Sequence, residues 1–221
     1  MSGLELNEFF PMWNELAPAD QELLLDSSSR RDVRRGEILH NGSADCTGLF
    51  ALLGGQLRSY IISSDGREVT LYRLLTRDIC LFSASCIMNS IQFEITIEAE
   101  KDSQLIVIPA DVYKSVMERS APLANYTSQL MAARFSEVMW LIEQIMWKSM
   151  DKRLAAFLLE ESVLDSSNVI KTTHDRVAAH LGTAREVVTR MLKYLQSEGM
   201  IRMTRGAIEL TDISRLSELA Q

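Results

Sequence analysis

The side chains with the clearest chemical potential lie between positions 185 and 193. Arg185, Glu186, Thr189, Arg190 and Lys193 follow one another at spacings of one, three, one and three residues, which places all five on one face of a helix. In the DNA major groove, Arg binds guanine through two hydrogen bonds and Glu accepts one from the cytosine amino group. We therefore interpret this face as a base-reading surface, with a Glu186–Arg190 ion pair one turn apart as the structural alternative.

The segments around this face have the helix start and stop signals of a helix-turn-helix. Thr173 is a good N-cap for a helix over 174–181, which Gly182 would close. A second helix is expected from about 184 to 198, closed by Gly199. The runs 201–203 and 207–210 flank the turn 204–206 and predict a hairpin, so the order is that of a winged helix-turn-helix. Its apolar contacts would join Val187, Val188, Met191, Leu192 and Leu195 to Val177, Ala178 and Leu181.

Three further residues complete the DNA-binding set that the sequence predicts. Thr183 and its backbone N–H stand at the start of the reading helix, where a phosphate can bind. Thr173 precedes the first helix of the pair, and Arg205 lies in the turn of the hairpin.

The net charge of −7 conceals a basic segment around these residues. Residues 171–205 carry +4, which leaves −11 for the rest of the chain. A local positive field on an acidic body is compatible with nucleic-acid binding at one place, although it is also typical of a solvated face. The basic residues are Lys171, Arg176, Arg185, Arg190, Lys193, Arg202 and Arg205, and the acidic ones are Asp175, Glu186 and Glu198.

The preceding part of the chain has the pattern of β structure. Between residues 33 and 108, short apolar runs alternate with turn signals, and the runs 57–62 and 68–75 flank a turn at 64–67 that is typical of a hairpin. Many short strands at this spacing predict a sandwich or barrel, the jelly roll included. A helix from about 4 to 25, broken around its two prolines, is expected before them.

A long helix is predicted from about 122 to 147, because this stretch has no glycine or proline in its interior. Its apolar residues recur at spacings of four and three, the a/d seam through which a helix usually meets another helix. The seam predicts a homodimer, with a single buried core helix as the alternative. Its members are Met131, Phe135, Val138, Ile142 and Ile145.

These patterns predict an α+β protein with three segments: a β domain of jelly-roll type over 1–120, a dimerisation helix over 121–147, and a winged helix-turn-helix domain over 148–221. The composition, 47% hydrophobic and 24% charged over 221 residues, is that of an ordinary soluble protein. We expect no membrane helix and no signal peptide. The three cysteines suggest reduced thiols and a cytoplasmic protein.

The stretch 173–201 resembles the helix-turn-helix of the cyclic-AMP-receptor and fumarate-nitrate-regulator family. The family's R-E-x-x-x-R appears as Arg185, Glu186 and Arg190, and Thr189 stands where the oxygen-sensing branch usually has Ser. Upstream, 35–42 resembles the family's entry into its β-roll, 49–60 resembles the next hairpin, and Asp78 stands where a Gly-Asp usually occurs. The resemblance covers nearly the whole chain, most strongly its C-terminal part.

This resemblance implies a transcription regulator that binds double-stranded DNA as a homodimer joined along the long helix. Its two-fold symmetric site would have half-sites one helical turn apart. An effector would shift the two DNA domains about a hinge near 147–150, and RNA polymerase would be a further partner.

The residues argue against a cyclic nucleotide as that effector. Where cyclic-nucleotide-binding members of the family supply a Glu for the ribose, residues 81–88 contain none. The family's phosphate-binding Arg-Ser pair falls near Phe93-Glu94, and a carboxylate there would repel a phosphate. We therefore expect a different effector, in a pocket formed by Cys80, Phe82, Ser83, Ser85, Cys86 and Phe93.

An iron–sulfur cluster is not expected either, because it needs about four cysteine ligands and only Cys46, Cys80 and Cys86 are present. Haem is the alternative cofactor, since 78–86 resembles the ligand segment of the family's carbon-monoxide sensor, with Cys80 on its thiolate and Phe82 in place of its histidine. Cys80 and Cys86 could instead be buried apolar residues or reactive thiols. No metal site is predicted.

The leading interpretation is therefore a dimeric transcription regulator with a non-nucleotide effector. A regulatory module whose helical domain contacts protein is the second. An enzyme is not expected, because the sequence has no Gly-rich phosphate loop, metal-spaced ligand set or nucleophile–base pair.

Overall fold

The computed structural model describes residues 6–42, 47–83 and 94–221. The chain forms two compact units, one of Met1–Ile61 and Leu71–Val138 and the other of Ile62–Thr70 and Met139–Gln221. In the described residues, no helix is both long and apolar enough to cross a membrane.

The N-terminal segment is less helical than the sequence suggested. Two short 3-10 turns at Leu6–Glu8 and Trp13–Glu15 precede α1 at Pro18–Ser27. The expected broken helix is therefore wrong over most of its length. Pro18 begins α1 rather than interrupting it, because a proline at the first helical position loses no hydrogen bond.

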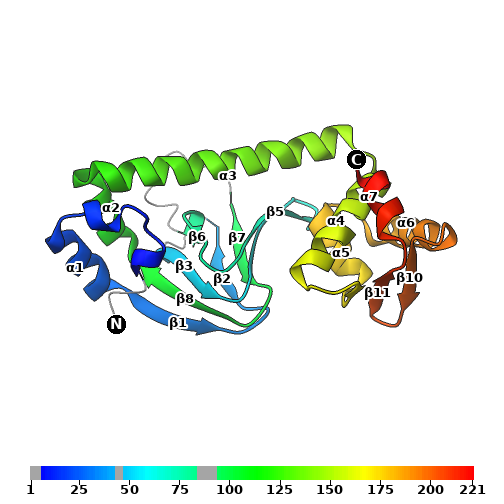
Figure 1. Ribbon diagram of the computed structural model, residues 1–221, viewed down its shortest axis with the longest axis horizontal. Coiled ribbons are helices and arrows are strands. Elements are labelled where there is room, and N and C mark those ends of the chain that lie inside the picture. Colours follow the sequence, from blue (N-terminus) through cyan, green and yellow to red (C-terminus); the bar gives the residue numbers. More distant parts are fainter. Residues whose placement is uncertain (1–5, 43–46, 84–93) are drawn as a thin grey trace. The chain divides into compact units, whose positions relative to one another are not determined.

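Two four-stranded antiparallel sheets form the β-roll in the described residues, and they confirm the predicted jelly-roll-like domain (Figure 1). β3 (Leu49–Gly54) is buried on both faces: Phe50 and Leu52 pack between the sheets, whereas Leu49 and Ala51 pack against the helices. One sheet has the order β1 (Ser29–Val33), β8 (Ser103–Ile108), β3, β6 (Ile79–Cys80), and the other β2 (Ile38–Asn41), β7 (Thr96–Ala99), β4 (Leu57–Ile62), β5 (Glu68–Leu74).

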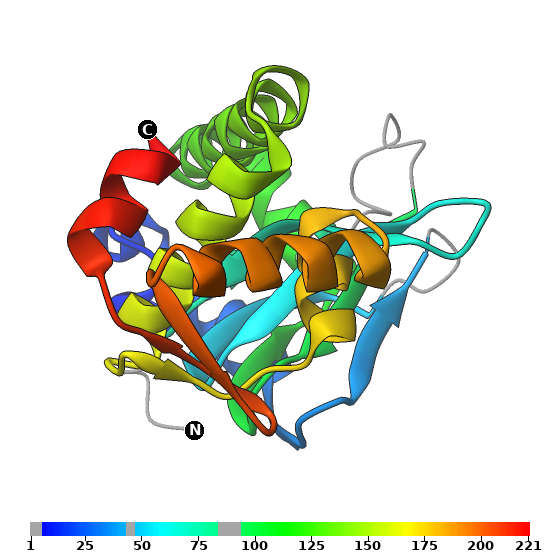
Figure 2. The same ribbon diagram turned by 90° about the vertical axis from the view of Figure 1, so that its right-hand side faces the viewer.

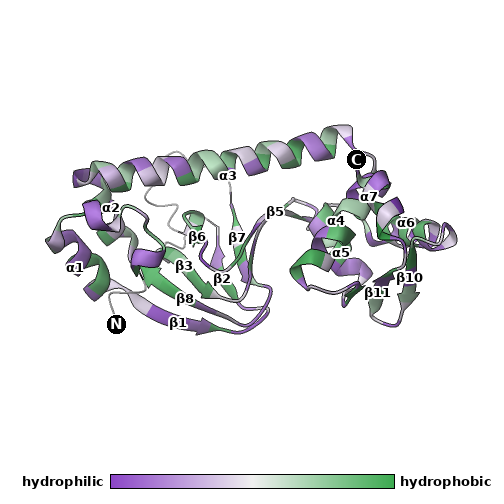
Figure 3. Cartoon of the chain, in the orientation of Figure 1, coloured by the Kyte–Doolittle hydropathy of each residue, from purple (hydrophilic) through white to green (hydrophobic). Residues whose placement is uncertain are grey.

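The long helix α3 runs from Ala121 to Trp147, one residue longer at its start than predicted. Before it lies α2 (Ala110–Arg119), for which the sequence pattern gave no prediction. Figure 3 shows hydrophobic and hydrophilic residues recurring along α3.

The second unit contains the winged helix-turn-helix that the sequence predicted. The β10–β11 hairpin gains an unpredicted third strand, β9, which pairs with β11. In Figure 2, α6 runs across the front of this unit with the hairpin beside it. Its elements are α4 (Met150–Leu164), β9 (Val169–Ile170), α5 (His174–Leu181), α6 (Arg185–Ser197), β10 (Ile201–Thr204), β11 (Ala207–Leu210) and α7 (Ile213–Ala220).

Candidate nucleic-acid interface

Both ends of α5 are fixed by residues next to it in the chain. The Thr173 hydroxyl accepts a hydrogen bond from the Arg176 N–H at 3.2 Å, as an N-cap does. Gly182 ends α5 with φ at +65°, a left-handed conformation that disfavours side chains with a Cβ. Both predicted boundaries of α5 are confirmed, and the chain can turn within three residues before α6 begins.

The inner side of α6 is apolar and anchors the helix. Val188, Leu192 and Leu195 are buried in one core cluster with Val177, Ala178 and Leu181, as the sequence predicted. Burying such side chains stabilises a helix by roughly 1.5–3 kcal/mol for each of the larger residues. The opposite face of α6 is therefore held toward solvent.

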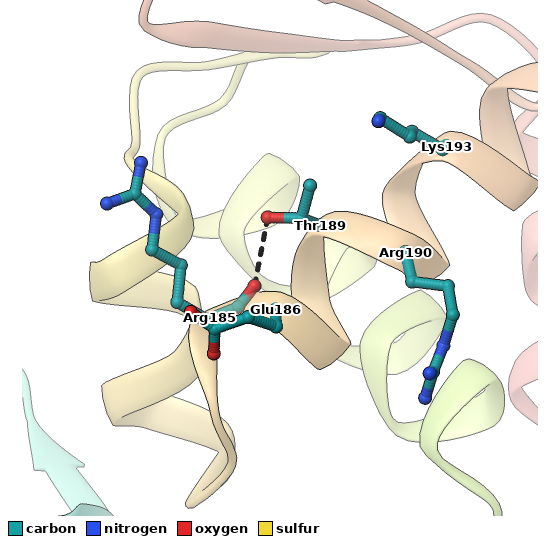
Figure 4. Close-up of a pocket in the computed structure, with 5 residues that line it drawn as sticks. All are labelled: Arg185, Glu186, Thr189, Arg190 and Lys193. Carbon is teal, nitrogen blue, oxygen red and sulfur yellow. Dashed lines mark hydrogen bonds between the residues drawn. The ribbon is translucent and has the colours of Figure 1, made fainter.

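The outer face of α6 carries all five residues of the predicted reading surface. Arg185, Glu186, Thr189, Arg190 and Lys193 together line one pocket, and Figure 4 shows Thr189 between Arg185 and Lys193. All are exposed except Thr189, which is half-buried. Three cations and one carboxylate thus share a surface that is positive on balance and offers both hydrogen-bond donors and acceptors.

Two contacts from α5 to this surface were not predicted. The Arg185 guanidinium lies 3.5 Å from a carboxylate oxygen of Asp175. The Nδ1 atom of His174 lies 2.8 Å from the Thr189 hydroxyl oxygen. No local sequence signal marks either pair, because residues ten and fifteen positions apart meet only once α5 packs on α6.

Of the other three predicted DNA contacts, Arg205 is exposed, whereas backbone or side-chain groups of Thr173 and Thr183 are used within the domain. The Thr183 N–H donates to the Ala178 carbonyl at 3.1 Å, so this N–H is not free for a phosphate as the sequence predicted, whereas a phosphate contact by the Thr183 hydroxyl stays a prediction. The cause is Gly182, whose left-handed conformation directs the following N–H back to α5. The Thr173 hydroxyl is engaged as a cap, while Arg205 is exposed in the β10–β11 turn.

The predicted effector residues are only partly described by the structure. Cys80, Phe82 and Ser83 are buried, while Ser85, Cys86 and Phe93 lie outside the described residues. Burial is the main cause that raises the pKa of the Cys80 thiol above its ordinary value. The described residues contain no cluster of three or more His, Cys, Asp or Glu arranged to hold a metal ion.

Tyr72 of β5 is a member of this buried group that sequence reasoning missed. Its ring centroid lies 5.9 Å from that of Phe82, and burial raises the pKa of its phenol well above the ordinary value. In the sequence, Tyr72 is only one of the apolar residues that alternate with polar ones along a strand. The packing of β5 against the rest of the core places it in the same cluster as Cys80.

The predicted seam on α3 is largely solvent-accessible in the single chain. Phe135 is 67% exposed, and Ile142 and Ile145 are exposed as well. Val138 is half-buried, and Met131 packs against the core of its own β-roll. Met131 therefore packs on the β-roll, whereas Phe135, Ile142 and Ile145 expose apolar side chains.

The fold and this surface define a class: a DNA-binding regulator with a cyclic-nucleotide-binding-type domain and a winged helix-turn-helix. Residues 30–120 match the family of cyclic nucleotide-binding domains, and residues 152–219 match that of Crp-like helix-turn-helix domains. The chain belongs to the Crp/Fnr family of transcription regulators.

Individual relatives agree with this family assignment. The chain is 30% identical to the transcriptional regulator SdrP of Thermus thermophilus, over 78% of this chain and 83% of SdrP. It is 26% identical to the cyclic AMP receptor protein of the same organism, over 95% and 96%. A crystal structure of a Crp/Fnr-family regulator from Eubacterium rectale superposes with a TM-score of 0.94 and 57% identity, covering 96% of this chain and 98% of that one.

Proposed function

We propose that this protein is an effector-responsive transcription regulator that binds a two-fold symmetric DNA site as a homodimer. The observation that carries the proposal is the outer face of α6, where Arg185, Glu186 and Arg190 are exposed on a helix anchored by its apolar side. A helix of this kind fits the major groove, and these side chains suit base edges. Acting on the chromosome, such a regulator works in the cytoplasm and contacts RNA polymerase.

The homodimer is supported by the exposed apolar seam of α3. Phe135, Ile142 and Ile145 would leave a row of large apolar side chains in water if the chain were monomeric. A second α3 packed along this seam would bury them, and the two-fold axis would place the two α6 helices on successive half-sites.

For the effector, we propose a small molecule that is neither a cyclic nucleotide nor haem. Haem is disfavoured because Phe82 stands where the carbon-monoxide sensor that the sequence resembles has its histidine, and because Cys80 is buried among apolar side chains that include Phe82. The absence of a ribose-binding Glu and of the phosphate-binding Arg-Ser pair disfavours a cyclic nucleotide.

Selection from a library of random-sequence duplexes, followed by affinity measurements at several salt concentrations, tests the DNA-binding part. We expect a palindromic sequence and an affinity that falls steeply with salt, because phosphate contacts release counterions. Sedimentation should give a dimer. A protein without sequence preference or salt dependence would instead support a module that contacts protein.

The effector part is tested by spectroscopy and calorimetry on the same protein. After incubation with haem, we expect no Soret band that persists through gel filtration. Titration with cyclic AMP should release no heat of binding. A persistent Soret band or saturable heat of binding would contradict this part of the proposal.

A further inference from the structure

The hydroxyl of Thr189 is held by two partners within the DNA-binding unit. It donates to the carbonyl oxygen of Arg185 at 2.9 Å, one turn earlier on α6, and lies 2.8 Å from Nδ1 of His174 on α5. Figure 4 shows the first of these bonds. The position of this hydroxyl therefore depends on both helices of the motif.

Counting hydrogens defines the role of each atom. A threonine hydroxyl has one hydrogen and two lone pairs. If that hydrogen points to the Arg185 carbonyl, the hydroxyl oxygen can only accept from His174, so Nδ1 must carry a hydrogen. The other tautomer would require the hydroxyl to give up the Arg185 carbonyl, and it would make one hydrogen bond fewer.

One lone pair of the Thr189 oxygen then remains for one further donor. An acceptor cannot bind a phosphate oxygen, guanine O6 or N7, or thymine O4, because these are acceptors themselves. The partners that remain in the major groove are the exocyclic amino groups of adenine and cytosine. Thr189 would thus accept a hydrogen bond from a base, whereas Arg185 and Arg190 donate hydrogen bonds to bases.

His174 also restricts where this lone pair lies. Threonine in a helix divides between two χ1 rotamers, because its hydroxyl can bond to a carbonyl of the preceding turn. The N–H of His174 favours the rotamer in which the hydroxyl faces α5. Donation from His174 also polarises the hydroxyl and strengthens its bond to the Arg185 carbonyl, so turning the hydrogen toward DNA becomes less favourable.

We propose that His174 is a specificity-determining residue that acts through Thr189: together they select a base pair presenting an adenine or cytosine amino group in the major groove. The inference rests on the proposed DNA-binding function. It adds that, at one base, the protein accepts the hydrogen bond and the base donates it. His174 is a positioning residue in this scheme, and Thr189 is the residue that contacts the base.

The test uses the duplex that the wild-type protein selects from a random library. Each adenine and cytosine of a half-site is replaced in turn by purine or 2-pyrimidinone, which lack the amino group but leave the backbone unchanged. For wild-type protein, we expect affinity to fall roughly threefold to tenfold at the base that faces Thr189, as for the loss of one hydrogen bond. Thr189→Val should abolish the loss at that base only.

Variants of His174 separate positioning from general stability. His174→Ala should reduce the amino-group dependence at the same base, whereas His174→Asn, whose amide can donate from nearly the position of Nδ1, should restore it. Adding His174→Ala to Thr189→Val should change the dependence no further. Glu186→Ala serves as the matched control, since it should affect a different base. Melting temperatures verify that every variant is folded.

Three results would overturn the inference. Wild-type protein could be indifferent to every replacement, Thr189→Val could keep the wild-type pattern, or ¹⁵N chemical shifts could show the neutral imidazole of His174 with its hydrogen on Nε2. If the wild-type protein selects no sequence at all, the proposed function itself fails. The two failures are thereby distinguished.

Discussion

The guanidinium group of Arg134 on α3 lies over the ring of Tyr72 on β5, with its Cζ atom 4.7 Å from the ring centroid. The same guanidinium binds both carboxylate oxygens of Glu137, at 2.9 and 2.8 Å. Since Tyr72 packs with Cys80 and Phe82, this contact connects the buried group of the β-roll to the long helix.

Removing this contact should destabilise the β-roll. We expect Arg134→Ala to lower the free energy of unfolding in urea by about 1–2 kcal/mol, because a partly buried cation over an aromatic ring and its apolar stem are both lost. Arg31→Ala is the matched control, since Arg31 is exposed and pairs with Glu37 at the surface; it should change stability by less than about 1 kcal/mol. Equal effects would show that the Arg134 contact contributes nothing specific.

Two basic residues of α6 should affect DNA binding differently. Arg190→Ala should cost about 1–3 kcal/mol of discrimination between the selected duplex and one mutated at a single base pair. Lys193→Ala should weaken binding to both duplexes alike and lower the slope against salt by about 1. Fluorescence anisotropy at several salt concentrations measures both. If Arg190→Ala binds the selected duplex as well as the parent does, the reading surface is misassigned.

The seam on α3 gives a prediction about assembly. Phe135→Asp should convert the proposed dimer to a monomer at micromolar concentration, because a carboxylate would be buried in the interface. Ser136→Asp adds the same charge one position away, on the side of α3 outside the seam, and should leave the dimer intact. Sedimentation equilibrium distinguishes the two, and dimers of both variants would exclude this interface.

Burial raises the pKa of the Cys80 thiol, so the thiol should react slowly in the folded protein. In a Cys46→Ser, Cys86→Ser variant, Cys80 is the only cysteine. We expect its reaction with Ellman's reagent at pH 8 to be at least about tenfold slower in buffer than in guanidinium chloride, because the thiolate is the reactive form and access is blocked. Equal rates would contradict the buried placement.

Tyr113 should make the folded protein sensitive to alkali. Burial raises the pKa of its phenol from 10.0 to about 12, against the lowering effect of its hydrogen bond with Thr127 at 2.7 Å. The unfolded chain ionises first, so its contribution to stability is complete below pH 10 and is lost as pH rises toward 12. The loss amounts to about 2–3 kcal/mol.

The variant Tyr113→Phe tests this dependence. It should cost about 1 kcal/mol at neutral pH, where the hydrogen bond is missing, and should flatten the fall in unfolding free energy between pH 9 and 11.5. Some dependence should remain, because burial also raises the pKa values of Tyr72 and Tyr126. An unchanged alkaline slope would contradict the assignment to Tyr113.

Features that arise from neighbours in the chain were predictable from the sequence. Gly182 marked the end of α5, the spacing from Arg185 to Lys193 placed five polar side chains on one face, and the turn at 204–206 marked the hairpin. In each case, the backbone conformation depends on residues within about two turns. The length of α3 followed for the same reason.

Features that join distant segments were decided by the tertiary structure alone. His174 meets Thr189, and Arg134 meets Tyr72. Strand order and the pairing of β9 with β11 belong to the same group. The periodicity of apolar residues indicates which side of a helix or strand is buried. It does not indicate which side chain of another element that side contacts, because the contact depends on how the two elements pack within the whole core.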